Sequence, residues 1–139
     1  MKTVSEQLKQ LAEQNLQEGG SPYSALVVLH DEVIATGVNQ AHRTNDPTQH
    51  AELLAIQQAL TKISLEEMKE AILYASGEPC PMCKAAAAYV QVKQIYYAVS
   101  RDEINALGKL PKNQNVQEVK LPASTVYDCF TMWQPNEGL

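Results

Sequence analysis

Two short motifs place the strongest constraint on how this chain can fold. One is His50-Ala51-Glu52, and the other is the Pro-Cys-Pro-Met-Cys sequence of residues 79–83. The second proline and the apolar run after it predict that the cysteines stand at the start of a helix, on one side of it. The two thiolates could then face one ion, with the histidine of another helix beside them. The fold must therefore bring the beginnings of two helices together.

The ligand types in these motifs indicate zinc with one open coordination position. His50, Cys80 and Cys83 supply one nitrogen and two sulfurs. Three protein ligands and an open position are typical of catalytic zinc, because a structural site is closed by a fourth ligand. Glu52 is expected beside the attacking water, where it could act as a general base and then as a general acid. We therefore expect one Zn²⁺ per chain.

These residue types also occur in sites of a different kind. The two cysteines could form a redox pair. A structural zinc would need a fourth ligand such as Cys129, His30 or His42. Glu52 alone could be an acid that the positive end of a helix dipole favours. The two motifs in this order, each at a predicted helix start, favour a catalytic zinc site over these alternatives.

Hydrophobic periodicity predicts the order of helices and strands. Val4, Leu8 and Leu11 recur at helical spacing, and Asp46-Pro47 is typical of a helix start. The predicted helices cover residues 3–17, 47–60, 81–89, 100–108 and 123–133, and the predicted strands cover 25–29, 33–38, 71–75, 95–99 and 116–121. Residues 39–47 are expected to form a polar loop. This order predicts an α/β sandwich with helices on both faces of one sheet.

Length and charge narrow the class of protein. The 139 residues suit a single domain over residues 1–139. The net charge is −5 and the 11 Lys and Arg residues are scattered, whereas surfaces that bind nucleic acid cluster such residues. A small uncharged substrate is therefore expected, and no nucleic acid. The sequence shows no signal peptide and no span long enough for a bilayer, so we expect a cytoplasmic protein without a membrane partner.

Longer stretches around the two motifs resemble the cytidine deaminase-like superfamily, and within it the nucleobase deaminase branch. They are Asn39, the NDPTQHAE sequence of residues 45–52 and the EPCPMC sequence of residues 78–83. His-x-Glu followed by Pro-Cys-x-x-Cys is the signature of zinc deaminases. The match covers about residues 22–99. It implies a three-layer α/β/α sandwich with a mixed five-stranded sheet, and a homodimer.

Within that branch the chain resembles bacterial guanine deaminases. The PYSA sequence of residues 22–25 is similar to their PFGA, and the FTMW sequence of residues 130–133 is similar to their FxxW. Residues 106–109 (ALGK) depart from their GFDD. Ser24 replaces the family's glycine and is expected to alter the floor of the substrate site.

The resemblance also implies residue roles and an activity. In the family, the counterpart of Asn39 hydrogen-bonds the base, and the peptide of Ala51 contacts its ring; Tyr23 could stack on it. Asn39 could instead be only a turn residue at a strand end. The implied reaction converts guanine to xanthine and ammonia. Alternatives are another small substrate (cytosine, a nucleoside or an aminotriazine), adenosine in tRNA, or a non-catalytic binding module folded around zinc.

Overall fold

A four-stranded mixed sheet forms the centre of the computed structural model, which describes residues 2–110, 116–122 and 126–135. The strand order is β2-β1-β3-β4. Strand β1 (Ser24–Leu29) is antiparallel to β2 (Glu32–Val38) and to β3 (Ile72–Gly77), and β3 is parallel to β4 (Gln94–Val99). The helices are α1 (Val4–Gln17), α2 (Ala41–Thr44), α3 (Ala51–Leu60), α4 (Leu65–Met68), α5 (Pro81–Tyr89), α6 (Arg101–Ala106) and α7 (Val126–Met132).

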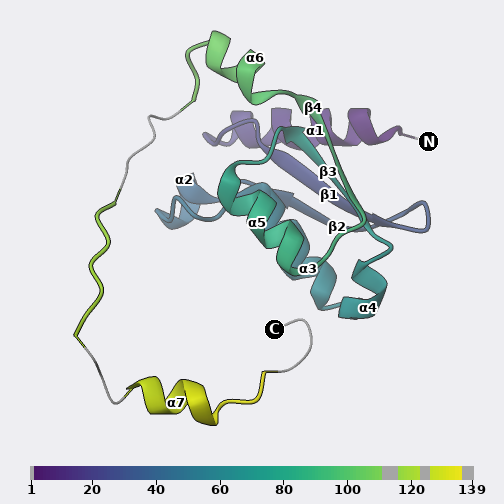
Figure 1. Cartoon of the computed structure of the whole chain (residues 1–139). Coiled ribbons are helices and arrows are strands. Elements are labelled where there is room, and N and C mark those ends of the chain that lie inside the picture. Colours follow the sequence, from purple (N-terminus) through teal and green to yellow (C-terminus); the bar gives the residue numbers. More distant parts are fainter. Residues whose placement is uncertain (1, 111–115, 123–125, 136–139) are drawn as a thin grey trace.

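Helices cover both faces of the sheet (Figure 1). On one face, Leu8 of α1 packs against Leu26 and Val28 of the central strand β1. On the other face, α3 contacts β1, β2 and β3 and lies beside α5. All six residues of β1 are buried, because helices cover this strand on both sides. The predicted α/β class and the mixed sheet are thus confirmed.

The sheet has four strands, so the prediction of a fifth strand at residues 116–121 was wrong. Val116, Val119 and Leu121 in this segment are all exposed. Apolar β-formers give a segment only a tendency, because a strand also needs a neighbouring edge for its backbone hydrogen bonds. Within the described residues, β4 therefore keeps one edge without a neighbouring strand.

The helix expected from Pro47 begins at Ala51 instead. The Asp46 carboxylate accepts hydrogen bonds from the backbone N–H and the hydroxyl of Thr48, at 2.9 and 2.6 Å. This local turn keeps Asp46 from capping the helix. The expected polar loop before it contains the short helix α2, which ends at Asn45 in the left-handed conformation with φ 57°.

Elements with strong local signals match their predictions closely. α1 and α5 differ by at most one residue from the predicted 3–17 and 81–89. α6 begins one residue after the predicted start at 100, with a capping box of Ser100 and Glu103. The hairpin turns at His30 and Asp31, both at positive φ, between the strands predicted at residues 25–29 and 33–38. No helix among the described residues combines the length and the apolar character that a membrane span requires.

Candidate metal centre

The two motifs occupy the starts of neighbouring helices, as predicted. His50 is the N-cap residue of α3, and Cys80 is the N-cap residue of α5 with Pro81 in its first turn. Both N-cap residues have extended backbone conformations, and neither side chain bonds its own helix. Cys83 follows within the first turn of α5 and is fully buried. The side chains of His50 and Cys80 are therefore free to act on something other than their helices.

These three side chains converge on one point. The Nδ1 atom of His50 lies 3.5 Å from the Sγ atom of Cys80 and 3.5 Å from the Sγ atom of Cys83. Zinc bonds of about 2.0–2.1 Å to nitrogen and about 2.3 Å to sulfur, at a tetrahedral angle, would separate the ligand atoms by roughly 3.5 Å. The spacing and the donor types of the group therefore fit zinc.

Within the described part of the chain, the group that could hold a metal ion contains only these three residues. None of the fourth ligands that a structural site would need lies in it. Cys129 is exposed on α7, His30 pairs with Glu70 at 3.3 Å, and the ring of His42 packs against Gly20. Three ligands leave a tetrahedral ion one open position, which is the arrangement of a catalytic site.

Glu52 is buried next to this group, with 4% of its surface exposed. Burial raises the pKa of its carboxyl, and hydrogen bonds from its own backbone N–H and from Cys83 partly oppose that shift. Burial and the nearby carboxylate also raise the pKa of the Cys83 thiol. A bound cation would favour the thiolate and so reverse this shift. Glu52 thus lies where it could exchange protons with a molecule at the open position.

A missing side chain fixes how closely α3 approaches the sheet. A Cβ atom on Gly37 of β2 would lie 2.3 Å from the carbonyl oxygen of Ala51 and 2.9 Å from the backbone nitrogen of Ala55. Only glycine permits this contact. Because His50 directly precedes Ala51, the contact also determines how close His50 lies to the sheet.

Tyr23 lies near the metal group. Its ring rests on Gly77, where an added Cβ atom would come within 2.8 Å of Cε1. Burial raises the pKa of its hydroxyl, Arg101 opposes this, and the charges of Glu52 and Cys80 add to it. The tyrosine therefore senses the same electrostatic environment as the proposed ligands.

Asn39 and Ala51 are the other two residues predicted to bind a base, and the structure shows how each is held. The N–H of Asn39 donates to the carbonyl oxygen of Tyr23 at 3.1 Å, and its side-chain oxygen accepts from the N–H of Ala41 at 2.9 Å. Ala51 is fully buried and opens α3, where backbone N–H groups lack acceptors within the helix. Their roles in binding a base stay predictions.

Comparison with known proteins identifies the family. The model of the MafB19-like deaminases matches residues 2–133 of the chain. The chain belongs to the MafB19-like deaminase family. Membership of this family confirms the predicted deaminase class and the cytidine deaminase-like resemblance.

Two kinds of deaminase are similar to this member of the family. Guanine deaminase of Bacillus subtilis (strain 168) is 37% identical over 89 residues, which span 64% of this chain and 57% of that protein. An X-ray structure of the Bacillus subtilis enzyme covers 97% of this chain and 96% of its own, with a TM-score of 0.77 and 27% identity. tRNA-specific adenosine deaminase 2 of Xenopus laevis is 28% identical over 137 residues, or 94% of this chain and 77% of that protein. The family is thus established, whereas these relatives differ in substrate.

One prediction about this MafB19-like deaminase fails in the structure. Ser24 was expected at the floor of the substrate site. Its hydroxyl instead donates to the carbonyl oxygen of Leu8 at 2.7 Å. Leu8 belongs to α1, which covers the opposite face of the sheet from α3 and α5 (Figure 1). A serine at this position therefore ties α1 to the sheet.

Sequence reasoning also missed Asn15, which lies 1% exposed on α1. A signal was present, because the apolar stripe of Val4, Leu8 and Leu11 continues at helical spacing to position 15. A polar residue on the buried stripe of a helix must find hydrogen-bond partners in the fold. Arg43 was missed as well. It donates to the side-chain oxygen of Asn15 at 3.1 Å, and this contact could not be inferred without the position of Asn15 in the fold.

Proposed function

We propose that this protein is a zinc-dependent enzyme that hydrolyses an exocyclic amino group from a nucleobase, converting guanine and water to xanthine and ammonia. The observation that carries the proposal is the convergence of His50, Cys80 and Cys83 at 3.5 Å spacing, with the buried carboxyl of Glu52 beside them. A metal-binding group with an open position and an adjacent proton carrier is what hydrolytic deamination requires.

The residues divide the chemistry between them. The zinc that His50, Cys80 and Cys83 would hold supplies a Lewis acid that makes water nucleophilic near neutral pH. Glu52 takes a proton from the attacking water while oxygen bonds to the amino-bearing carbon. Glu52 gives this proton to a ring nitrogen, then takes the remaining proton of the new hydroxyl group and passes it to the amine. The carbon–nitrogen bond breaks as the carbonyl forms, and the amine leaves as ammonia. Burial favours this cycle because a raised pKa lets the carboxyl both accept and release a proton.

The neighbouring residues would hold the base. The side-chain oxygen of Asn39 is bonded to Ala41, so the amide nitrogen is the group that can donate to an oxygen or ring nitrogen of the substrate. The backbone N–H of Ala51, at the first position of α3, offers a second donor. The ring of Tyr23, fixed on Gly77, offers a flat surface for stacking.

Two observations favour free guanine over tRNA. The net charge of −5 does not suit a polyanion. The guanine deaminase structure also aligns with 97% of this chain, whereas a tRNA:A34 deaminase structure, 33% identical, aligns with 68% at a TM-score of 0.63. A tRNA adenosine deaminase is the second candidate, because the Xenopus relative aligns with 94% of the chain. Salt-sensitive binding of tRNA would favour that candidate.

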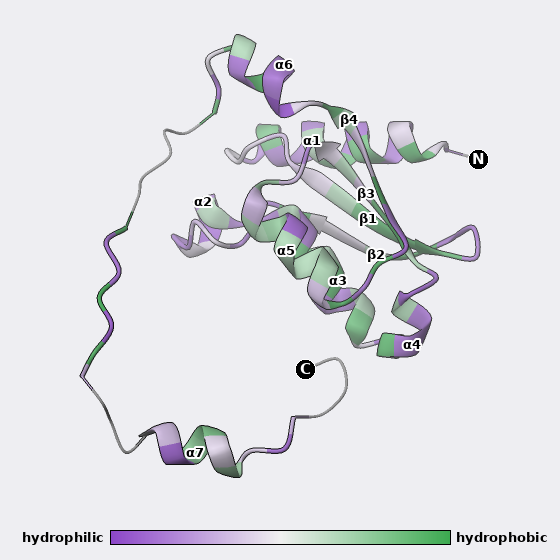
Figure 2. Cartoon of the chain, viewed as in Figure 1, coloured by the Kyte–Doolittle hydropathy of each residue, from purple (hydrophilic) through white to green (hydrophobic). Residues whose placement is uncertain are grey.

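We further propose a homodimer in which α7 packs against a partner subunit. Phe130 and Trp133 at the end of the chain are 65% and 56% exposed and stack edge to face. Figure 2 shows hydrophobic residues on α7 although this helix lies apart from the sheet. At the free edge of the sheet, Tyr96 and Tyr97 of β4 are also about half exposed. Exposed apolar surfaces of this kind are typical of protein interfaces.

The test is ammonia release by the zinc-loaded protein from guanine, adenine, cytosine, their nucleosides and ammeline. Wild-type protein should release ammonia from guanine. Glu52→Gln should keep its zinc and lose at least about a hundredfold in kcat, because general acid–base groups contribute on this scale. Glu67→Gln is the matched control, since Glu67 is an exposed glutamate of α4 outside the site.

The outcomes separate the hypotheses. Near wild-type turnover by Glu52→Gln would exclude its role as the proton carrier. Silence of the zinc-loaded wild type on all free bases and nucleosides, together with turnover of adenosine in tRNA, would replace guanine by the second candidate. Zinc bound without turnover of any substrate would indicate a binding module.

A further inference from the structure

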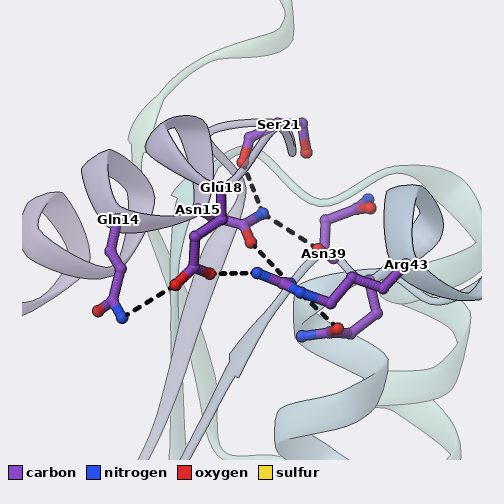
Figure 3. A network of polar contacts seen from close by, with 7 residues as sticks. Gln14, Asn15, Glu18, Ser21, Asn39 and Arg43 are labelled. Carbon is purple, nitrogen blue, oxygen red and sulfur yellow. Dashed lines mark hydrogen bonds and ion pairs between the residues drawn. The ribbon is translucent and has the colours of Figure 1, made fainter.

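The buried side chain of Asn15 connects the N-terminal helix to the loop that carries Asn39 (Figure 3). Its amide nitrogen donates to the carbonyl oxygen of Ser21 at 2.9 Å and to that of Asn39 at 3.0 Å. Its oxygen accepts from a guanidinium nitrogen of Arg43 at 3.1 Å. All three bonds go to residues outside α1. The side chain therefore does nothing for its own helix and joins three other points of the fold.

Arg43 keeps this connection in place from the solvent side. Its guanidinium pairs with the carboxylate of Glu18 and also bonds the side-chain oxygen of Gln40 at 3.1 Å. Figure 3 shows the guanidinium reaching towards α1, with dashed lines to the side chains of Glu18 and Asn15. Because Arg43 donates to Asn15, it orients the amide so that the nitrogen faces the two carbonyl groups.

The contact with Asn15 completes the fixation of Asn39. The backbone N–H of Asn39 is held by Tyr23, its side-chain oxygen by Ala41 and its carbonyl oxygen by Asn15. Within the described residues, the side-chain amide nitrogen of Asn39 is the donor left without a protein acceptor. Every other polar group of this residue thus serves to hold that nitrogen in one place.

The fixed loop is connected directly to the metal group. The N–H of Gln40 donates to the carbonyl oxygen of Gln49 at 3.0 Å, and Gln49 directly precedes His50. Tyr23, whose carbonyl oxygen holds Asn39, feels the charges of Glu52 and Cys80. A displacement of Asn39 would therefore change the distance between the proposed base-binding amide and the proposed reaction centre.

We propose that Asn15 is a positioning residue for substrate binding, which acts through the backbone of Asn39 and is itself oriented by Arg43. The inference rests on the proposed function, in which the Asn39 amide binds the base. Without Asn15, the carbonyl oxygen of Asn39 has no donor, and its amide nitrogen samples positions that do not suit the base. Misplacement of a binding group weakens binding without changing the proton transfer of Glu52.

The experiment is a double-mutant cycle of Asn15→Ala, Asn39→Ala and the double variant, with zinc content, Tm, kcat and KM measured for each. Asn15 lines a cavity of about 260 Å³, so water can enter the vacated space and the variant should fold with a lowered Tm. Each single variant should raise KM, by about tenfold for Asn39→Ala, with kcat changed less than about twofold. In the Asn39→Ala background, Asn15→Ala should add less than about twofold to KM.

Two further variants separate positioning from general loosening. Arg43→Met removes the orienting donor and leaves Asn15 in place, so KM should rise by about two- to threefold. Gln14→Ala is the matched control, because Gln14 lies beside Asn15 on α1 and, among the described residues, its side chain bonds Glu18 alone. This control should leave KM unchanged.

Amide hydrogen exchange tests the connection without any substrate. Asn15→Ala should accelerate exchange at the N–H groups of Asn39 and Ala41 well beyond the change in the strands, whereas Gln14→Ala should not. Unchanged exchange at these two amides would overturn the proposal, whatever the activity. So would a KM effect of Asn15→Ala that is equally large in both backgrounds. Accelerated exchange in a protein inactive on all free bases would instead refute the proposed substrate.

Discussion

The region from α1 to α6 and the C-terminal helix α7 use apolar residues in opposite ways. In the first region, Leu8 of α1 and the alanines of α3 are buried against the sheet, and Val4 and Leu11 are partly buried beside Leu8. In α7, Tyr127, Phe130 and Met132 are all exposed, and so is Trp133 directly after it. Apart from the half-exposed Tyr96 and Tyr97 at the edge of the sheet, the first region therefore contains its own packing partners, whereas α7 carries a surface whose partner lies outside the described contacts. The metal group belongs entirely to the first region.

Replacing a metal ligand should destabilise the region from α1 to α6 and leave α7 unaffected. Cys83→Ser should reduce bound zinc to near zero and abolish turnover. It should also lower the free energy of unfolding by roughly 4 kcal/mol, the contribution of a ligand present at a thousand times its Kd. Metal analysis and chemical denaturation measure both effects. Cys129→Ser is the matched control on α7 and should retain zinc; equal zinc loss in this variant would place α7 at the metal.

A smaller effect is expected where α3 meets the sheet. Gly37→Ala places a Cβ atom against the backbone of Ala51 and Ala55, which cannot rotate away. Overpacking of this kind costs about 1–3 kcal/mol, and the displaced helix should also bind zinc more weakly. Thermal unfolding and zinc titration test this. Thr36→Ala, an exposed neighbour on β2, should change stability by less than about 0.5 kcal/mol; an equal loss there would contradict the packing argument.

The smallest effect on the stability of the first region should come from α7. Trp133→Ser should leave zinc binding and the unfolding of a protomer nearly unchanged. It should weaken the proposed dimer by roughly thirtyfold, which corresponds to the loss of about 2 kcal/mol from an aromatic interface residue. Light scattering over a range of protein concentrations measures the shift towards monomer. Tyr89→Ser, which alters an exposed aromatic residue of α5, should not shift it; a monomeric wild type would refute the dimer.

Elements that depend on nearby residues could be predicted from the sequence, whereas elements that depend on distant partners could not. α1, α5 and the start of α6 depend on caps, prolines and periodicity within a few residues of themselves, and they were predicted closely. The expected strand at residues 116–121 depends on a neighbouring edge that no local pattern specifies. The start of α3 was misplaced because the carboxylate of Asp46 bonds Thr48 rather than the helix.

The candidate site divides in a similar way. His50, Cys80 and Cys83 were predictable because metal chemistry restricts both residue type and spacing. Asn15 and Gly37 were not, because their partners lie elsewhere in the sequence: Asn15 bonds the carbonyl of Asn39, and Gly37 touches the backbone of Ala51. A polar residue on an apolar stripe indicates a buried hydrogen bond, but it does not identify the partner residue.

The starts of α3 and α5 differ from those of α1, α4 and α6, each of which has a complete capping box. His50 and Cys80 stand at N-cap positions and do not bond their own helices, although a capping side chain contributes about 1 kcal/mol. An ion bound by both residues would hold the first turns of the two helices together. Loss of that ion should then fray both helix starts together, so that exchange at their first amides would report metal occupancy before any global unfolding.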